Sequence, residues 1–158
     1  MRAILSTALL WFAAIGCGLM GGIYFAFSTF IMRAFATLDP AQASAAMNAI
    51  NAVILRSPFM PLFWATTLSA LALVVLAAPE WQTTPGRLAL AGGLVYLLGM
   101  FGCTVAFNVP LNDQLAAASG DAAAWQRYLA EWTRWNHLRT LASTLACAGF
   151  VWALVARR

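Results

Sequence analysis

The longest uncharged run in the chain lies near its N-terminus, where no charged side chain occurs between Arg2 and Arg33. The run covers 30 residues, and an α-helix needs only about 20 apolar residues to cross the hydrocarbon core of a bilayer. A cleaved signal peptide has an apolar core of only about 7–15 residues, so the run is too long to be one. It predicts an uncleaved membrane span at about residues 4–31.

The composition of the whole chain supports this interpretation. Hydrophobic residues make up 63% of the 158 residues and charged residues 9%, whereas an average soluble domain has about 25% charged residues. Fourteen charged side chains are too few to cover a soluble domain of this length. The composition therefore excludes a water-soluble enzyme, and its high apolar content excludes a disordered chain.

Three further apolar runs are long enough to span a membrane or nearly so. An amphipathic segment, residues 39–56, follows the first span, and Pro40 suits the first position of a helix there. Pro110 predicts the end of the third span, because proline lacks a backbone donor. A helical pattern resumes near Asp121 and continues without a break into the last span. The sequence predicts a single all-α domain, residues 1–158: an integral membrane four-helix bundle with an additional interfacial amphipathic helix and spans at about 4–31, 59–78, 88–107 and 138–156.

The basic residues predict the orientation of this bundle. Four spans place both termini on one side of the membrane, and the short segments on that side carry Arg2, Arg87, Arg157 and Arg158. Since cytoplasmic segments carry an excess of basic residues, we expect both termini in the cytoplasm, in a multi-pass protein of the cytoplasmic membrane if the source is bacterial. The basic residues are scattered singly as interface anchors, so the partner they indicate is a lipid bilayer and no nucleic acid.

Motifs for metals, nucleotides and covalent catalysis are missing from the sequence. Cys17, Cys103 and Cys147 form no C-x-x-C pair, and His137 is the sole histidine, so we expect neither a disulfide framework nor a metal site. No P-loop, G-x-G-x-x-G or G-x-S-x-G motif occurs. Gly18 and Gly22 have the G-x-x-x-G spacing, which favours close helix contacts within the bundle or between chains, so a homo-oligomer remains one option.

Uncharged polar residues gather on the membrane face opposite the termini. Asn and His are costly in lipid unless they face protein or water, so their convergence indicates a polar site. The residues concerned come from the first long loop, the end of the third span and the start of the fourth: Asn48, Asn51, Asn108, Asn112, Trp132, Trp135, Asn136, His137 and Arg139.

A helical wheel of the last helix sharpens this prediction. Trp132, Asn136 and Arg139 fall on one face, which we expect to point into the bundle, while His137 lies about 100° away. Ordinary structural roles remain open for each residue. Tryptophans at a span end form interfacial belts, an arginine there can snorkel, asparagines beside Pro110 can cap a helix, and the histidine can be structural.

Four segments resemble a known family: Gly21-Gly-Ile-Tyr-Phe-Ala-Phe-Ser28, Met47-Asn-Ala-Ile-Asn51, Asn108-Val-Pro-Leu-Asn112 and Trp132-Thr-Arg-Trp-Asn-His-Leu-Arg139. In order and over nearly the whole chain, they resemble the anthrone oxygenase-like family of small four-span membrane proteins. Asn48 departs from the pattern, which has Gln there. The resemblance implies a four-helix membrane bundle and, in some members, oxidation of an anthrone to an anthraquinone by O₂ with no obvious cofactor.

The predicted polar residues suit such chemistry. An anthrone loses a proton to give an electron-rich enolate that reacts with O₂, so the site needs a base and donors for the enolate oxygen. His137 suits the base, Arg139 and the amides of Asn48, Asn51, Asn108, Asn112 and Asn136 suit the donors, and Trp132 and Trp135 suit binding of a flat aromatic ligand. We expect no cofactor, with O₂ as co-substrate.

Two other classes of function remain open at this stage. The chain could bind or transport a small hydrophobic molecule, which predicts saturable binding without O₂ consumption. It could instead be a structural membrane protein whose polar cluster only holds helices together. The lone histidine, which helix packing does not require, favours the first two classes over the third.

Overall fold

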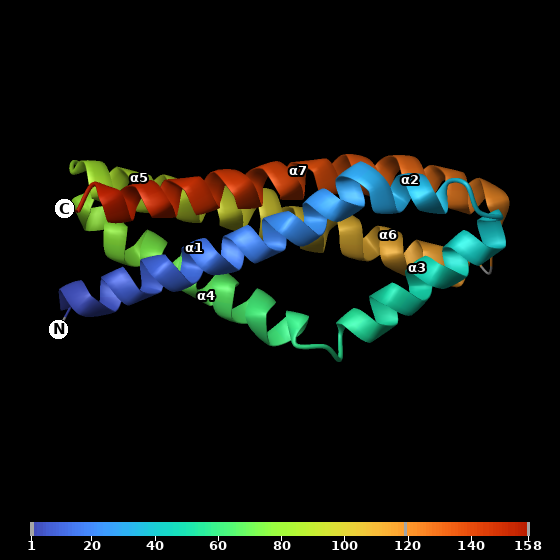
Figure 1. Cartoon of the computed structure of the whole chain (residues 1–158), viewed down its shortest axis with the longest axis horizontal. Coiled ribbons are helices and arrows are strands. Elements are labelled where there is room, and N and C mark those ends of the chain that lie inside the picture. The colour runs from blue at the N-terminus through green and yellow to red at the C-terminus, as the bar shows by residue number, and fades with distance from the viewer. Residues whose placement is uncertain (1, 119, 158) are drawn as a thin grey trace.

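The computed structural model describes residues 2–118 and 120–157, and this part of the chain is all-helical (Figure 1). Within it, four helical rods are long and apolar enough to cross a membrane. Ile4, Leu98 and Trp152 are among many large apolar side chains exposed on the outside of the bundle. An exterior of this kind suits lipid, and the fold class predicted from the sequence is confirmed.

Each rod combines α-helix with shorter helical segments of other types, except the last. The first rod consists of α1 (Arg2–Ala26), the π-helical η1 (Phe27–Ile31) and α2 (Met32–Phe35). The second consists of α4 (Phe59–Ala77) and the 3₁₀ turn η2 (Ala78–Glu80). The third consists of α5 (Thr84–Val95), the π-helical η3 (Tyr96–Gly102) and η4 (Thr104–Asn108), and α6 (Val109–Ala117). The fourth is α7 (Ala122–Val155), and α3 (Pro40–Ile54) joins the first two rods.

Aspartate side chains cap the N-termini of α3 and α7 and fix where these two helices begin. The carboxylate of Asp39 accepts a hydrogen bond from Ala41 N at 2.9 Å, and Pro40 takes the first position of α3. The carboxylate of Asp121 accepts from Ala123 N at 2.6 Å and from Ala124 N at 3.3 Å. These caps satisfy backbone donors that a helix leaves free at its start. They confirm the helix starts predicted near these aspartates.

The third rod does not end at Pro110, contrary to the sequence prediction. It continues from η4 into α6 and reaches Ala117. A proline ring clashes with the carbonyl four residues earlier in an α-helix, but the π-helical turn of η4 ends two residues before Pro110 and widens the helix at that point. The extra residue in the turn makes room for the ring, so the rod continues past Pro110 without a break.

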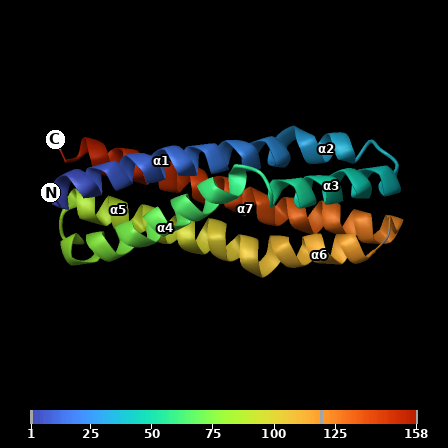
Figure 2. The same cartoon turned by 90° about the horizontal axis from the view of Figure 1, so that it is seen from below.

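The third and fourth rods extend past the hydrophobic core of a bilayer. Each has 34 residues, or about 51 Å at the rise of an α-helix, whereas the hydrocarbon core is only about 30 Å thick. At the end away from the termini, α3 packs on α6 and α7 (Figure 2). Met47 of α3, Leu111 and Leu115 of α6, and Trp125 and Tyr128 of α7 form an apolar cluster there.

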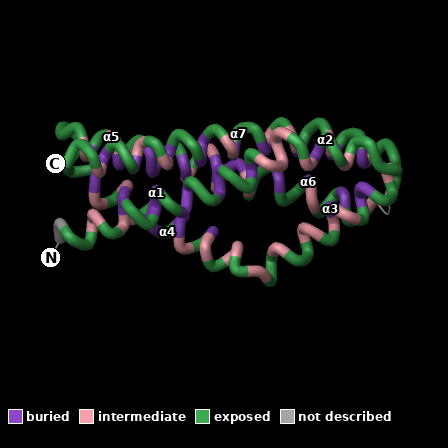
Figure 3. The backbone as a smooth tube through the Cα atoms, in the orientation of Figure 1, coloured by how far each residue is buried: buried purple, intermediate pink, exposed green. Residues whose placement is uncertain are grey.

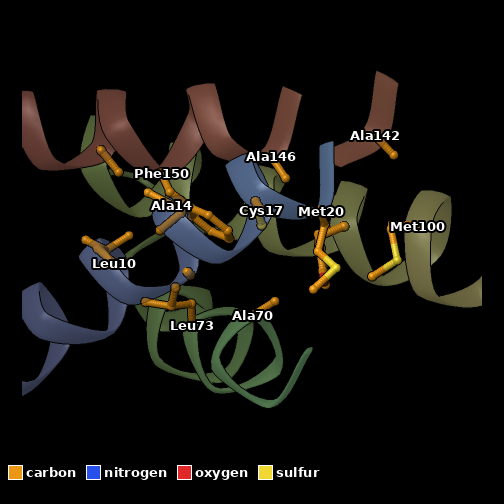
Figure 4. Close-up of a cluster of buried hydrophobic side chains, with 14 of the residues drawn as sticks. Leu10, Ala14, Cys17, Met20, Ala70, Leu73, Met100, Ala142, Ala146 and Phe150 are labelled. Atoms are coloured by element: carbon orange, nitrogen blue, oxygen red, sulfur yellow. The ribbon is translucent and has the colours of Figure 1, made fainter. Parts of the chain in front are cut away.

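The main core lies between the rods at the end nearer the termini. Leu10, Met20, Leu73, Met100 and Phe150 come from all four rods and are buried against small residues of their neighbours (Figure 4). Buried residues face the interior of the bundle and exposed residues its surface (Figure 3). The first and last rods are also tied at their outer ends, where Arg157 Nη1 donates to Ser6 Oγ at 2.9 Å.

Candidate functional site

A cavity of about 310 Å³ lies between the core and the apolar cluster of α3, α6 and α7. Its volume is at the lower end of the range for small-molecule sites. All four rods and α3 contribute to its wall, which is mostly apolar and aromatic. Figure 1 shows α3 and α4 diverging from the other helices towards their junction, and Ile54, Leu55, Phe59 and Met60 from this junction line the cavity.

Arg139 is the one cation among the residues that line this cavity. Its side chain is buried, and its guanidinium carbon lies 4.4 Å from the centre of the Tyr24 ring and 4.9 Å from the centre of the Trp132 ring. Two aromatic faces stabilise a desolvated cation through the negative faces of their π-systems. The arginine is therefore held inside the bundle, and the snorkelling alternative does not apply to it.

Asn136 provides the hydrogen-bond acceptor for this guanidinium. Arg139 Nη2 donates to Asn136 Oδ1 at 2.7 Å, and Asn136 Nδ2 donates to Tyr24 O and to Ser28 Oγ, both at 2.7 Å. Ser28 Oγ lies 3.0 Å from Thr140 Oγ1, which donates to Asn136 O. The amide thus joins α7 to the first rod and fixes the guanidinium from one side.

The π-helical segment η1 explains why a side chain can reach the backbone of the first rod. A π-helical turn shifts the hydrogen-bond ladder by one residue and frees a carbonyl near its start. Tyr24 lies three residues before η1, and its carbonyl accepts from Asn136, while the carbonyl of Phe25 accepts from Thr29 Oγ1. The irregular helix therefore provides part of the polar network beside the cavity.

The guanidinium has no carboxylate partner. Arg139 forms no ion pair, and the part of the chain that the structure describes leaves its Nε without an acceptor. Two other donors that border the cavity, Asn51 Nδ2 and Trp132 Nε1, are also buried without a partner. Buried donors without partners are uncommon in proteins and cost free energy. The cavity wall therefore carries three buried side-chain donor atoms without a partner.

The structure brings most of the predicted site residues together. Asn51, Asn112, Trp132 and Arg139 line the cavity, and Asn136 holds the arginine from behind. Asn108 is buried next to them, but its Nδ2 donates to Trp132 O at 3.3 Å and its side chain caps no helix.

Three predicted residues lie elsewhere. His137 is exposed on the outer face of α7 and does not line the cavity. Trp135 stacks on Phe107, with ring centres 3.8 Å apart, outside the cavity. Asn48 is half-buried on α3 and does not reach the cavity either. The exposure of His137 follows from the helical wheel, which places it about 100° from Asn136.

The sequence prediction missed three polar residues that line the cavity, Tyr24, Thr104 and Asp113. Tyr24 supplies one of the rings against Arg139, and a tyrosine in the middle of an uncharged span was a signal for it. Asp113 lines the cavity too, and its position next to Asn112 was the only hint. Among residues 2–118 and 120–157, no group of three or more His, Cys, Asp and Glu is placed to hold a metal ion.

Fold and site together define a small multi-pass membrane protein with a mostly apolar cavity, whose wall carries a buried guanidinium without a carboxylate partner. Residues 51–149, well over half of the chain, match the anthrone oxygenase family, and the chain belongs to that family. The match runs from the last turn of α3 into α7 and includes Asn51, Asp113, Trp132 and Arg139. Comparison with curated proteins and with solved structures gives no significant match.

Proposed function

We propose that this protein is a membrane oxygenase that uses O₂ to oxidise a hydrophobic aromatic ketone in the cavity beside Arg139. The observation that carries the proposal is the buried guanidinium, flanked by two aromatic rings and without a carboxylate partner. A buried charge without a counter-ion costs several kcal/mol, about 3–5 kcal/mol when a partner has been removed. A substrate that develops negative charge on oxygen would supply the missing partner.

The chemistry of an anthrone matches these features. Loss of one proton from its CH₂ group gives an enolate whose charge lies on the carbonyl oxygen, and Arg139 is placed to stabilise this charge in a dry environment. The enolate carbon then reacts with O₂ and a proton to form a hydroperoxide. Loss of water from the hydroperoxide gives the second carbonyl. One anthrone and one O₂ yield one anthraquinone and one water, and no further oxidant is required.

The lining of the cavity suits a flat apolar substrate. Phe27, Phe63, Phe101 and Trp132 are among its aromatic residues. Aromatic rings bind planar ligands through stacked or edge-to-face contacts. Ile23, Trp64 and Val105 also line the cavity and are exposed on the part of the bundle that suits lipid. We therefore expect the substrate to enter from the bilayer.

The test measures O₂ uptake and quinone formation by the purified protein in lipid nanodiscs, with anthrone as the probe and the spontaneous oxidation subtracted. We expect one O₂ per anthrone and a rate that falls at least about 100-fold in Arg139→Lys, because one oxyanion donor typically contributes that much. Arg134→Lys is the matched control, since Arg134 is exposed on the same helix and lies outside the cavity.

The same measurement separates the competing functions. Equal rates in Arg139→Lys and the wild type would contradict the proposal. Saturable anthrone binding without O₂ uptake would assign the protein to the binding or transport class. If anthrone neither binds nor is oxidised, the polar cluster only stabilises the bundle.

A further inference from the structure

Asp113 differs from the other acidic residues of this chain. The sequence has five carboxylates. Asp39 and Asp121 cap helices, Glu131 is exposed on α7, and Glu80 lies at the end of the second rod near the termini. Asp113 is the one carboxylate among the residues that line the cavity.

The Asp113 carboxylate and the Arg139 guanidinium border the same cavity without pairing. No ion pair joins them, so their charged atoms lie more than 4.0 Å apart. A pair in contact would neutralise both groups and leave neither free for a ligand. Their separation keeps a proton acceptor and an oxyanion donor available in one cavity at the same time.

The two groups also differ in their contact with water. Arg139 is buried, whereas Asp113 is exposed on α6 while still lining the cavity. A base has to release its proton after each turnover, and an exposed carboxylate exchanges protons with water directly. A buried guanidinium, in contrast, is screened less by water, so its charge acts more strongly on a ligand than an exposed charge would.

We propose that Asp113 is the catalytic base of this cavity, an inference that rests on the proposed function. Its carboxylate removes a proton from the acidic CH₂ carbon of the bound ketone. The C–H bond breaks, the proton moves to a carboxylate oxygen of Asp113, and the electron pair delocalises onto the carbonyl oxygen, which Arg139 holds. The protonated carboxyl then passes the proton to water, and the step involves no oxidant.

This arrangement selects for a particular kind of substrate. In an anthrone, the carbonyl and the CH₂ group lie on opposite sides of the central ring. A donor and a base that border one cavity without touching suit a planar molecule of this kind, which presents its oxygen to one group and its acidic carbon to the other.

The experiment follows proton removal separately from oxidation. Protein in nanodiscs is incubated with anthrone in D₂O without oxygen, and mass spectrometry measures deuterium at the CH₂ carbon above the spontaneous rate. We expect exchange by the wild type and a loss of at least about 100-fold in Asp113→Asn, a typical contribution of a general base. Glu131→Gln is the matched control, because that carboxylate is exposed outside the cavity.

A second variant keeps the test valid if Asp113→Asn folds poorly. Asp113→Ala is assayed with and without added formate, which can enter the space of the missing carboxylate. Recovery of exchange with formate supports the inference, since the same folded protein is measured in both assays. Absence of recovery, or equal exchange in Asp113→Asn and the wild type, overturns it.

Failure of this inference can be told apart from failure of the proposed function. If the wild type oxidises anthrone and Asp113→Asn exchanges deuterium at the wild-type rate, the base is another group and the oxygenase proposal stands. If the wild type exchanges deuterium through Asp113 and takes up no O₂, the base assignment stands and the oxygenase proposal fails.

Discussion

Arg139 Nη2 donates to Asn136 Oδ1 at 2.7 Å, so one amide from the preceding turn of α7 holds the only cation of the cavity wall. The same amide donates to the backbone of the first rod at Tyr24. Asn136 therefore joins the position of the guanidinium to the packing of α7 on α1. Displacement of the first rod at Tyr24 would also displace the arginine.

Asn136→Ala should destabilise the protein more than any other amide substitution near the cavity. It removes three hydrogen bonds, two donated by Nδ2 and one accepted by Oδ1, and it leaves Arg139 without an acceptor. Polar contacts between membrane helices contribute about 0.6 kcal/mol each on average, and an unpaired buried cation adds to the cost, so we expect a loss of about 2–4 kcal/mol. Thermal unfolding in detergent measures it.

The matched control for this prediction is Asn48→Ala. Asn48 is half-buried on α3, and its side chain makes no hydrogen bond in the described structure. We expect its free energy of unfolding to stay within about 0.5 kcal/mol of the wild type, as for most substitutions away from buried contacts. Equal losses in the two variants would contradict the role assigned to the Asn136 network.

Asn51→Leu should separate ligand binding from stability. Asn51 Nδ2 is buried without a partner on the cavity wall, and removal of an unsatisfied buried donor does not lower stability. We expect a melting temperature equal to or above that of the wild type, together with weaker binding of anthrone because a donor to the ligand is lost. A lower melting temperature would show that the amide has a structural partner.

Tyr24 should stabilise the Arg139 guanidinium through its aromatic ring and not through its hydroxyl group. The hydroxyl donates to the sulfur atoms of Met20 and Met100, at 4.0 and 3.5 Å, whereas the ring centre lies 4.4 Å from the guanidinium carbon. Tyr24→Phe keeps the ring, so we expect a change below about 1 kcal/mol, while Tyr24→Leu should cost about 2–4 kcal/mol. Chemical unfolding of both variants in detergent tests this order, and equal losses would contradict it.

The last helix shows what periodicity alone predicts well. In an uninterrupted helix of 34 residues, the spacing between two residues determines the angle between their side chains around the helix axis. The prediction that Trp132, Asn136 and Arg139 face the interior is therefore confirmed. The same wheel placed His137 on another face, where the structure finds it exposed. Its assignment as a base came from its chemistry and from the family resemblance, and spacing gave it no support.

Other parts of the site depend on contacts that periodicity does not report. The third rod continues past Pro110 because a π-helical turn precedes it, and the sequence pattern of such a turn does not distinguish it from an α-helix. The placement of Asp113 and Tyr24 in one cavity depends on how α6 and the first rod pack against α7. A sequence shows that such residues are polar and where they lie along a helix. Whether residues of different helices line the same cavity depends on the tertiary structure.

Gly16 should be the glycine on which the packing of the first rod depends. A Cβ atom at Gly16 would overlap Thr66 Oγ1 of α4 and lie 2.8 Å from Thr66 Cγ2. Gly22, one of the pair with G-x-x-x-G spacing, has nothing within 4 Å of such an atom, and Gly18 meets only Cys147 Sγ at 3.6 Å. Within the first rod, the closest approach to a neighbouring helix is therefore at Gly16 and not at the pair with G-x-x-x-G spacing.

We expect Gly16→Ala to destabilise the protein by about 1–3 kcal/mol, the usual cost of overpacking. Gly22→Ala should be neutral or stabilising, since alanine favours helix over glycine. The double variant Gly16→Ala/Thr66→Ala should recover much of the loss, because it removes the atoms that the new methyl group meets. Thermal unfolding of the three proteins in one detergent checks this, and no difference between the two single variants would refute it.

His137→Ala tests the one predicted catalytic residue that the structure places outside the cavity. His137 is exposed, and its side chain makes no hydrogen bond in the described structure. Surface substitutions usually change free energies by less than about 0.5 kcal/mol, so we expect anthrone oxidation within about twofold of the wild-type rate. Deuterium exchange without oxygen should also be unchanged, in contrast to Asp113→Asn. A loss of exchange in His137→Ala, with thermal stability intact, would mean that the imidazole reaches the substrate in a conformation of α7 different from this one.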